Sequence, residues 1–279
     1  MRKPVVNIAV QAARNASKVI LRSLGKLDSL QVVEKERMDF VTDVDRAAEA
    51  EIIKELRRAY PDHGILGEES GYSGNVKSRF QWIIDPLDGT SNFLRGLPFF
   101  SISIALVEAG VPIAGVVYNP MSEELFTAHK GSGAFLNDKR IRVGNKTSVA
   151  GALIGTGFSP RQRARLPTQL RMIKQLLTQA EDLRRFGSAA LDLAFVACGR
   201  FDGFFEFGLK PWDMAAGILL VREAGGLCLD FDGNEGFMES GNIVAGNLKV
   251  TTSMVSAMRV PKVTVAQAKA GTAGSLEDL

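Results

Sequence analysis

The sequence contains few of the residues that bind soft metals or form disulfide bonds. Its 279 residues include only two cysteines, Cys198 and Cys228, and two histidines, His63 and His129. Both cysteines lie in apolar stretches, so neither a disulfide framework nor a thiolate metal site is expected. Two histidines are too few for a histidine-based metal centre, and we expect no catalytic role for them. Any metal would be held by oxygen ligands, which favours magnesium, manganese or calcium over zinc.

The chain also lacks long hydrophobic runs and a strong excess of one charge. No uninterrupted apolar stretch reaches the ~20 residues of a transmembrane helix. The N-terminal segment is broken by Asn7, Gln11, Arg14 and Asn15, which is the pattern of an amphipathic helix and not of a signal peptide. These absences predict a cytoplasmic protein without a membrane partner. A formal net charge of +3 is too small to indicate a nucleic-acid-binding protein.

The apolar content is sufficient for a large core, because 46% of the residues are hydrophobic and 23% are charged. In the first half, periodicity and turn residues predict helices over 5–24 and 43–59, strands over 63–67 and 80–85, and an antiparallel meander over 101–107, 112–118 and 124–128.

From about residue 150, strands and helices alternate, which favours an α/β arrangement. We expect a compact unit of two lobes, with an N-terminal lobe over 1–148 and a C-terminal lobe over 149–258. Residues 259–279 have no apolar period and are predicted to be a disordered tail. In the second lobe the predicted strands are 152–156, 182–186, 201–207, 226–231 and 242–245, and the predicted helices are 166–180, 188–198 and 212–224.

The strongest chemical signal is the segment Trp-Ile-Ile-Asp-Pro-Leu-Asp-Gly-Thr-Ser-Asn-Phe at 82–93. Pro86 fixes φ and removes a backbone donor, so the strand is expected to end there. Asp85, Asp88 and the carbonyl of Leu87 are the oxygen ligands that hard cations prefer. The N–H groups at the helix start that follows Gly89 form a phosphate site. The two together indicate metal-assisted phosphate chemistry, although the same residues are also common in plain turns.

Acidic residues at three other places in the sequence are candidates for the same site. Glu68 and Glu69 follow the apolar end of the strand 63–67, and Asp213 directly precedes an apolar helical run. Asp45 lies in the first turn of the helix 43–59. For its neighbour Asp43, a helix N-cap explains the residue as well as chemistry does.

Charge repulsion limits how these carboxylates can be used. Two carboxylates about 4 Å apart repel each other by roughly 4 kcal/mol at an effective dielectric constant near 20. If Glu68, Asp85, Asp88 and Asp213 converge, divalent metal must therefore occupy the site.

The order of these motifs resembles the inositol monophosphatase family, and its bacterial branch in particular. The resemblance extends from about residue 5 to 255 and implies a layered α-β-α-β-α sandwich of the sugar-phosphatase type, α+β or α/β in class. It also implies a Mg²⁺-dependent phosphatase acting on inositol-1-phosphate or a related polyol phosphate. The matching motifs are Gly67-Glu68-Glu69-Ser70, Asp85-Pro86-Leu87-Asp88-Gly89-Thr90-Ser91-Asn92-Phe93, Trp212-Asp213 with Ala215-Ala216-Gly217, and Glu223-Ala224-Gly225-Gly226.

The resemblance implies two or three Mg²⁺ ions per site, with Mn²⁺ as an alternative and Li⁺ as an inhibitor. The first ion would be bound by Glu68, Asp85 and the Leu87 carbonyl, the second by Asp85, Asp88 and Asp213, and a third by Glu68. Lys35 would correspond to a mobile lysine near the metals.

The resemblance also implies catalytic and substrate-binding residues. Thr90 and Asp45 would orient the attacking water and take its proton, with Glu68 as a further catalytic residue. The substrate would be bound by Asp88, the N–H groups of Gly89 and Thr90, the Gly187-Ser188-Ala189 turn, and Glu206.

Members of the family differ in substrate and in partners. Fructose 1,6-bisphosphate, NADP, histidinol phosphate and phosphoadenosine phosphate stay open as substrates, but Glu206 favours a polyol monophosphate. A binding role in transcription and rRNA-processing complexes, with contact to RNA polymerase or transcription factors, is a second reading. Only the basic clusters at 161–165 and 184–185 bear on it. Family members form homodimers, and the segment 99–118 either contributes to such an interface or is buried within one subunit.

Overall fold

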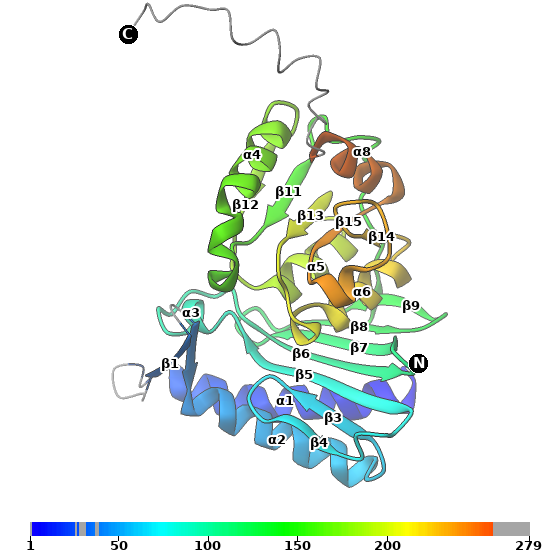
Figure 1. Cartoon of the computed structure of the whole chain (residues 1–279). Coiled ribbons are helices and arrows are strands. Elements are labelled where there is room, and N and C mark those ends of the chain that lie inside the picture. Colours follow the sequence, from blue (N-terminus) through cyan, green and yellow to red (C-terminus); the bar gives the residue numbers. More distant parts are fainter. Residues whose placement is uncertain (1, 26, 28–31, 37–38, 259–279) are drawn as a thin grey trace, which may run out of the picture.

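Two sheets and three layers of helices alternate through the computed structural model, which describes residues 2–25, 27, 32–36 and 39–258 (Figure 1). Helices α1 (Pro4–Leu24) and α2 (Asp43–Ala59) cover the outer face of a large sheet, and α5 (Ala189–Ala197) and α6 (Pro211–Glu223) lie between the two sheets. Helices α4 (Leu166–Leu177) and α8 (Leu248–Met258) cover the outer face of the small sheet. The predicted α-β-α-β-α sandwich is therefore confirmed.

The large sheet has the strand order β10-β9-β8-β7-β6-β5-β3-β4. The meander predicted from the sequence is confirmed as β6 to β8, and it continues into β9 and β10, which we did not predict. Strands β3 and β5 are parallel neighbours, so their carboxyl ends meet at one edge of the sheet. The strands are β3 (Gly64–Gly67), β4 (Gly71–Gly74), β5 (Phe80–Asp88), β6 (Ser101–Glu108), β7 (Val111–Asn119), β8 (Glu124–His129), β9 (Gly133–Leu136) and β10 (Lys139–Arg140).

The small sheet has the order β12-β11-β13-β15-β14 and is mixed. Strand β11 runs parallel to β12 and β13, as the strand–helix alternation predicts, but β15 lies between β13 and β14 and is antiparallel to both. The insertion of a late strand leaves no local signature, so the sequence could not reveal it. The strands are β11 (Leu153–Thr156), β12 (Asp182–Arg184), β13 (Gly203–Glu206), β14 (Leu227–Leu229) and β15 (Ile243–Gly246).

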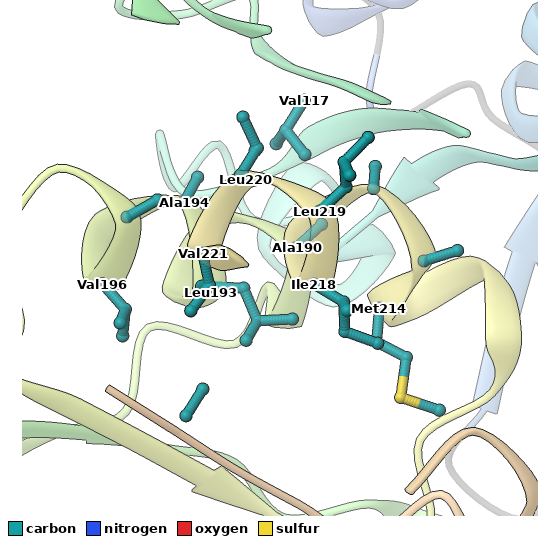
Figure 2. Close-up of a cluster of buried hydrophobic side chains, with 14 of the residues drawn as sticks. Val117, Ala190, Leu193, Ala194, Val196, Met214, Ile218, Leu219, Leu220 and Val221 are labelled. Carbon is teal, nitrogen blue, oxygen red and sulfur yellow. The ribbon is translucent and has the colours of Figure 1, made fainter. Parts of the chain in front are cut away.

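Each pair of adjacent layers shares a hydrophobic core. One core joins α1 and α2 to the large sheet, one joins the two sheets through α5 and α6, and one joins the small sheet to α4 and α8. Figure 2 shows the middle core, where apolar side chains of α5 and α6 pack with Val117 of β7. This core contains residues from both predicted lobes, for example Phe126 and Phe195, whose rings meet edge to face. The lobe boundary near residue 148 stays a prediction.

The remaining elements connect the layers. A hairpin of β1 (Val32–Glu36) and β2 (Asp39–Thr42) precedes α2, and α3 (Thr90–Phe93), α7 (Phe237–Ser240) and a 3₁₀ helix (Pro160–Arg165) are short. Helix α8 was not predicted. The predicted tail at 259–279 and the side chain of Lys35 lie outside the part of the chain that is described.

The prediction that the strand ends at Pro86 is wrong, because β5 continues to Asp88. Asp85 pairs with Ser103 and Asp88 with Ser101, so three steps along β5 face two along β6 and form a bulge. A bulge does not require the ladder N–H that proline lacks. In a regular strand, residues three apart point to opposite faces, and the extra residue lets both aspartates reach the same cleft.

Two further predictions concern surfaces. Residues 101–107 are buried within this one chain, which favours the second alternative for the meander over an interface role. Among the described residues, no helix is long and apolar enough to cross a membrane. The cytoplasmic location stays a prediction.

Candidate active site

A cleft opens where β3, β5 and β13 end and where α3, α5 and α6 begin. Of the site residues predicted from the sequence, those that line it are Glu68, Asp85, Leu87, Asp88, Gly89, Thr90, Gly187, Ala189, Glu206 and Asp213. We call the side formed by Glu68, Asp85, Asp88 and Thr90 the first wall, and the side formed by Arg185, Ala189, Glu206 and Asp213 the second wall. The remaining predicted residues, Asp45 and Ser188, are buried behind these walls.

The first wall concentrates negative charge on the ends of β3 and β5. Asp85 is 1% exposed, and its Oδ1 accepts a hydrogen bond of 3.0 Å from the N–H of Leu87. Burial raises the pKa of Asp85 well above its ordinary value, and the charges of Glu68, Asp88 and Asp213 raise it further. A hydrogen-bonding interaction with the Glu68 side chain raises the pKa of Asp85 as well. The structure therefore brings the four predicted carboxyl groups within interaction range of one another.

Asp88 connects the first wall to the start of α5. Its Oδ2 accepts hydrogen bonds of 2.7 Å from the hydroxyl of Ser188 and from the N–H of Ala190. Burial raises the pKa of Asp88 to about 6, although these two hydrogen bonds act in the opposite direction. Ser188 is fully buried and also lies 3.2 Å from the hydroxyl of Ser101. It therefore contacts Asp88 and not the open cleft, where the sequence prediction had placed it.

Thr90 links the cleft to a buried carboxyl group. Its Oγ1 lies 3.0 Å from Asp45 Oδ1 and 3.1 Å from the carbonyl oxygen of Leu87. Asp45 Oδ2 accepts from both the N–H (2.8 Å) and the hydroxyl (2.5 Å) of Thr42, the N-cap residue of α2. Burial raises the pKa of Asp45, which makes this carboxylate a better proton acceptor. The adjacent Asp43 is the first residue of the helix and not its cap.

A tight junction brings the Gly89 turn against the Gly187 turn. Gly89 has φ 95°, and a Cβ on it would lie 2.9 Å from the carbonyl oxygen of Phe99 and 3.2 Å from that of Gly187. Neither the backbone nor the space allows a side chain there. Asn92 Nδ2 donates to the carbonyl oxygens of Phe99 (2.6 Å) and Phe186 (2.7 Å). Asn92 belongs to the motif at 82–93, but nothing in the sequence identified its partners.

The second wall places polar groups at a strand end and at helix starts. Asp213 is the third residue of α6, and its Oδ2 accepts a 2.7 Å hydrogen bond from the N–H of Lys210. Glu206, at the end of β13, is 7% exposed, and its carboxylate fills the space that a Cβ on Gly157 would need. Arg185 belongs to the basic cluster at 184–185 that the sequence links to a binding role, and the structure places it in the cleft lining.

A second pocket adjoins the cleft and shares Ser91, Phe158, Ser159 and Arg185 with it. Its described lining also contains Arg95 and Arg163 and no acidic residue. If a ligand extends from the cleft into this pocket, a negatively charged group at that end of the ligand would lie near three arginines.

The donors in the cleft fit a hard divalent cation better than any other group. Carboxylates and a backbone carbonyl are the ligands that Mg²⁺ and Mn²⁺ take, and buried like charges favour such an ion. Within the described ranges, however, no three His, Cys, Asp or Glu side chains stand at the spacing of metal ligands. The donor chemistry therefore matches a metal site whose ligands are not preassembled.

Comparisons with known proteins bear on the family and the fold of the chain. A sequence model of the inositol monophosphatase family matches residues 1–263. A relative named Nus factor SuhB, from Xylella fastidiosa, is 55% identical over 260 residues, covering 91% of this chain and 94% of its own. The crystal structure of extragenic suppressor protein suhB from Bartonella henselae has a TM-score of 0.90 at 45% identity and covers 93% of this chain and 100% of that chain. The structure of inositol monophosphatase from Anabaena has a TM-score of 0.83 at 38% identity, with coverages of 93% and 97%.

Proposed function

Because the chain belongs to the inositol monophosphatase family, we propose that it is a Mg²⁺-dependent phosphatase that releases phosphate from inositol-1-phosphate or a related polyol phosphate. The observation that carries the proposal is the group of four carboxyl groups, Glu68, Asp85, Asp88 and Asp213, in one cleft with the start of α3. Glu68, Asp85 and the Leu87 carbonyl would hold one ion, and Asp85, Asp88 and Asp213 another.

The residues around these donors would handle the water and its proton. The chemistry that Mg²⁺ supplies when bound is neutralisation of phosphate charge and a lower pKa for water. Thr90 Oγ1 can accept a hydrogen bond from the attacking water while it donates its own proton towards Asp45 Oδ1, 3.0 Å away. Asp45 is 2% exposed, so the accepted proton is shielded from solvent. No covalent intermediate with the protein is required.

The substrate would be oriented by groups from both walls. The N–H groups of Gly89 and Thr90 lie at the start of α3, where a phosphate is favoured. Glu206 and Ala189 also line the cleft, and the Glu206 carboxylate can accept hydrogen bonds from sugar or inositol hydroxyl groups. This arrangement favours a polyol monophosphate.

The pocket with Arg95, Arg163 and Arg185 supports a second substrate class. Its positive charge would suit substrates with another phosphate, such as fructose 1,6-bisphosphate, NADP or phosphoadenosine phosphate. The test is phosphate release from inositol-1-phosphate and these three compounds, with Mg²⁺ and with a chelator. Mg²⁺-dependent turnover that is fastest on inositol-1-phosphate supports the proposal, whereas fastest turnover on a compound with two phosphates supports this alternative.

A binding role is the second candidate function, because the relatives from Xylella fastidiosa and Escherichia coli are named Nus factor SuhB. Such a role would involve contact with RNA polymerase or its transcription factors. The basic clusters at 161–165 and 184–185 bear on it, and within them the side chains of Arg163, Arg165 and Arg185 are exposed. Loss of RNA-polymerase association, with phosphatase activity retained, after substitution of Arg163 and Arg165 by serine would support this role. Absence of turnover on every substrate, from folded protein with Mg²⁺, would favour binding over catalysis.

The family resemblance also leads us to propose a homodimer. Leu97, Leu166 and Leu170 are 47%, 40% and 51% exposed, and a subunit interface would cover such side chains. Light scattering on the purified chain measures its mass directly: a value of twice 30.2 kDa supports the dimer, and a value of 30.2 kDa contradicts it.

A further inference from the structure

Glu49 is a buried carboxylate whose position the proposed mechanism does not explain. It lies on α2 one turn after Asp45 and is 2% exposed. Its Oε2 accepts a hydrogen bond of 3.0 Å from the N–H of Glu69, and its Oε1 accepts one of 2.9 Å from the N–H of Ser70. Both donors belong to the turn that begins with Glu68. One carboxylate therefore holds this turn through two charge-assisted hydrogen bonds.

The Glu49 carboxylate lies directly against Gly67, where a side chain would otherwise be. A Cβ on Gly67 would stand 2.6 Å from Cδ and 2.8 Å from Oε1 of Glu49, and its three nearest neighbours would all be atoms of that carboxylate. Real Cβ contacts are not this short, so either Glu49 or a side chain at 67 would have to move. The glycine thus allows Glu49 to approach the backbone of the turn.

The turn is fixed from a second direction by the sheet. The N–H of Glu68 donates to the carbonyl oxygen of Ile84 in β5 at 3.0 Å. Residue 68 is thereby anchored to β5, while residues 69 and 70 are anchored to α2. These hydrogen bonds fix the backbone of residues 68 to 70. They therefore also fix the direction in which the Glu68 side chain leaves the backbone, which is towards Asp85.

Asp45 and Glu49 are four residues apart and therefore lie on one face of α2. Asp45 contacts Thr90 in one loop of the first wall, and Glu49 contacts the other loop. This face of α2 supports both loops from behind.

We propose that Glu49 is a positioning residue that holds the 67–70 turn so that Glu68 can bind a divalent cation together with Asp85. The proposal rests on the proposed function only for the role of Glu68 as a metal ligand. Residues that orient metal ligands typically change metal affinity 10- to 100-fold when they are replaced. In Glu49→Gln, one acceptor oxygen becomes an NH₂ group facing a backbone N–H, so one of the two hydrogen bonds is lost.

The experiment is a titration of the purified full chain with Mn²⁺ alone, in which free Mn²⁺ is followed by its electron paramagnetic resonance signal. We expect Glu49→Gln to raise the Kd about tenfold, and Glu68→Gln to raise it more. The matched control is Glu55→Gln, because Glu55 is also buried on α2 but pairs with Arg58 at 2.8 Å and not with the turn. Its Kd should equal that of the wild type.

Gly67→Ala provides a second variant, which keeps Glu49 but displaces its carboxylate, and it should raise the Kd in the same direction. If Glu49→Gln does not fold, the Kd of Gly67→Ala tests the proposal in its place. Wild-type affinity in either folded variant, with weakened binding in Glu68→Gln, overturns the proposal and leaves the proposed function intact. Absence of Mn²⁺ binding by the wild type overturns both. Mn²⁺ binding that depends on Glu49, in a protein that hydrolyses no phosphate ester, supports the positioning role and refutes the phosphatase.

Discussion

The two walls of the cleft hold their acidic groups in different ways. In the first wall, Glu68 follows β3, and Asp85 lies within β5, the parallel neighbour of β3. Helix α2 supports this wall from behind, because Asp45 contacts Thr90 and Glu49 contacts the turn at 68–70. In the second wall, Asp213 stands in the first turn of α6, where the helix dipole favours a negative charge. Strand register brings the carboxyl groups of the first wall together, whereas a helix start stabilises the charge of Asp213 individually.

This difference suggests a division of tasks. The first wall gathers buried like charges whose pKa values are raised, and it suits cation binding and proton transfer. The second wall adds a single further carboxylate for the cation, along with Glu206 and Arg185, which suit substrate recognition. Substitutions should therefore have their largest effects on turnover in the first wall, and on fold stability at the junction between the walls.

The largest effect is expected for Asp88→Asn, which removes charge from the first wall but keeps an acceptor for Ser188 and Ala190. The turnover number should fall at least ~100-fold, because even residues that only orient metal ligands cost 10–100-fold. The melting temperature should change little. The measurement is Mg²⁺-dependent phosphate release, with the exposed Asp62→Asn as a control. A variant with half the wild-type turnover and normal magnesium dependence would contradict the assignment.

The second largest effect is expected for Asn92→Ala, which should weaken the junction between the two walls and lower the stability of the fold. It leaves the carbonyl oxygens of Phe99 and Phe186 without their amide donor. Each buried acceptor that loses its partner costs about 1–3 kcal/mol, so loss of both should lower the free energy of unfolding by roughly 2–6 kcal/mol. Urea denaturation measures this value, and the exposed neighbour Ser91→Ala should change it by less than ~0.5 kcal/mol. An equally small loss for Asn92→Ala would show that the junction does not depend on this amide.

Removal of divalent cations should destabilise the first wall. A cation present at 100 times its Kd adds about 2.7 kcal/mol to the stability of the folded state. For a chain of this size that corresponds to a rise of about 5 °C or more in melting temperature with Mg²⁺ relative to chelator. Calorimetry at constant ionic strength measures the shift, and Asp88→Asn should reduce it. An unchanged melting temperature in the wild type would argue against the metal site.

The smallest effect is expected behind the second wall, at Asp192 of α5. Both of its carboxylate oxygens are buried and have no hydrogen-bond partner among the described residues. Burial raises the pKa of Asp192 well above its ordinary value, the charges of Glu206 and Asp88 raise it further, and Arg185 lowers it. Asp192→Asn removes a carboxyl group whose ionisation opposes folding, and such changes typically stabilise by less than about 2 kcal/mol.

The pH dependence of this effect has a definite sign. A carboxyl group with a raised pKa in the folded state contributes its stability below the unfolded pKa and loses it as pH rises through the folded value. The stability gained in Asp192→Asn should therefore be near zero at pH 4 and should increase towards pH 8. Urea denaturation across this range measures the gain, and a gain that is constant with pH would contradict an ionising Asp192.

Much of the fold could be predicted because its signals are local. Helical periodicity located α1 and α2 to within a residue, and alternating apolar runs located β6 to β8. The bulge in β5 was missed because Pro86 is usually a strand terminator, and β9 was missed because Gly133 suggested a turn. Strand β15 was located as an element, but its place between β13 and β14 depends on packing across the whole small sheet.

By itself, the sequence determined the reactive residue types and their local frames: two aspartates around Pro86, a glycine turn, and acidic residues near strand ends and helix starts. Tertiary structure alone decided which groups meet. Glu49 accepts hydrogen bonds from the backbone of residues 69 and 70, which are 20 and 21 residues further along the chain. Asn92 donates to the carbonyl oxygen of Phe186, which is 94 residues further along. Local patterns follow from backbone geometry, whose range is a few residues. The partners of a buried polar group depend on the packing of whole layers, which bring distant segments together and exclude water from the contacts between them.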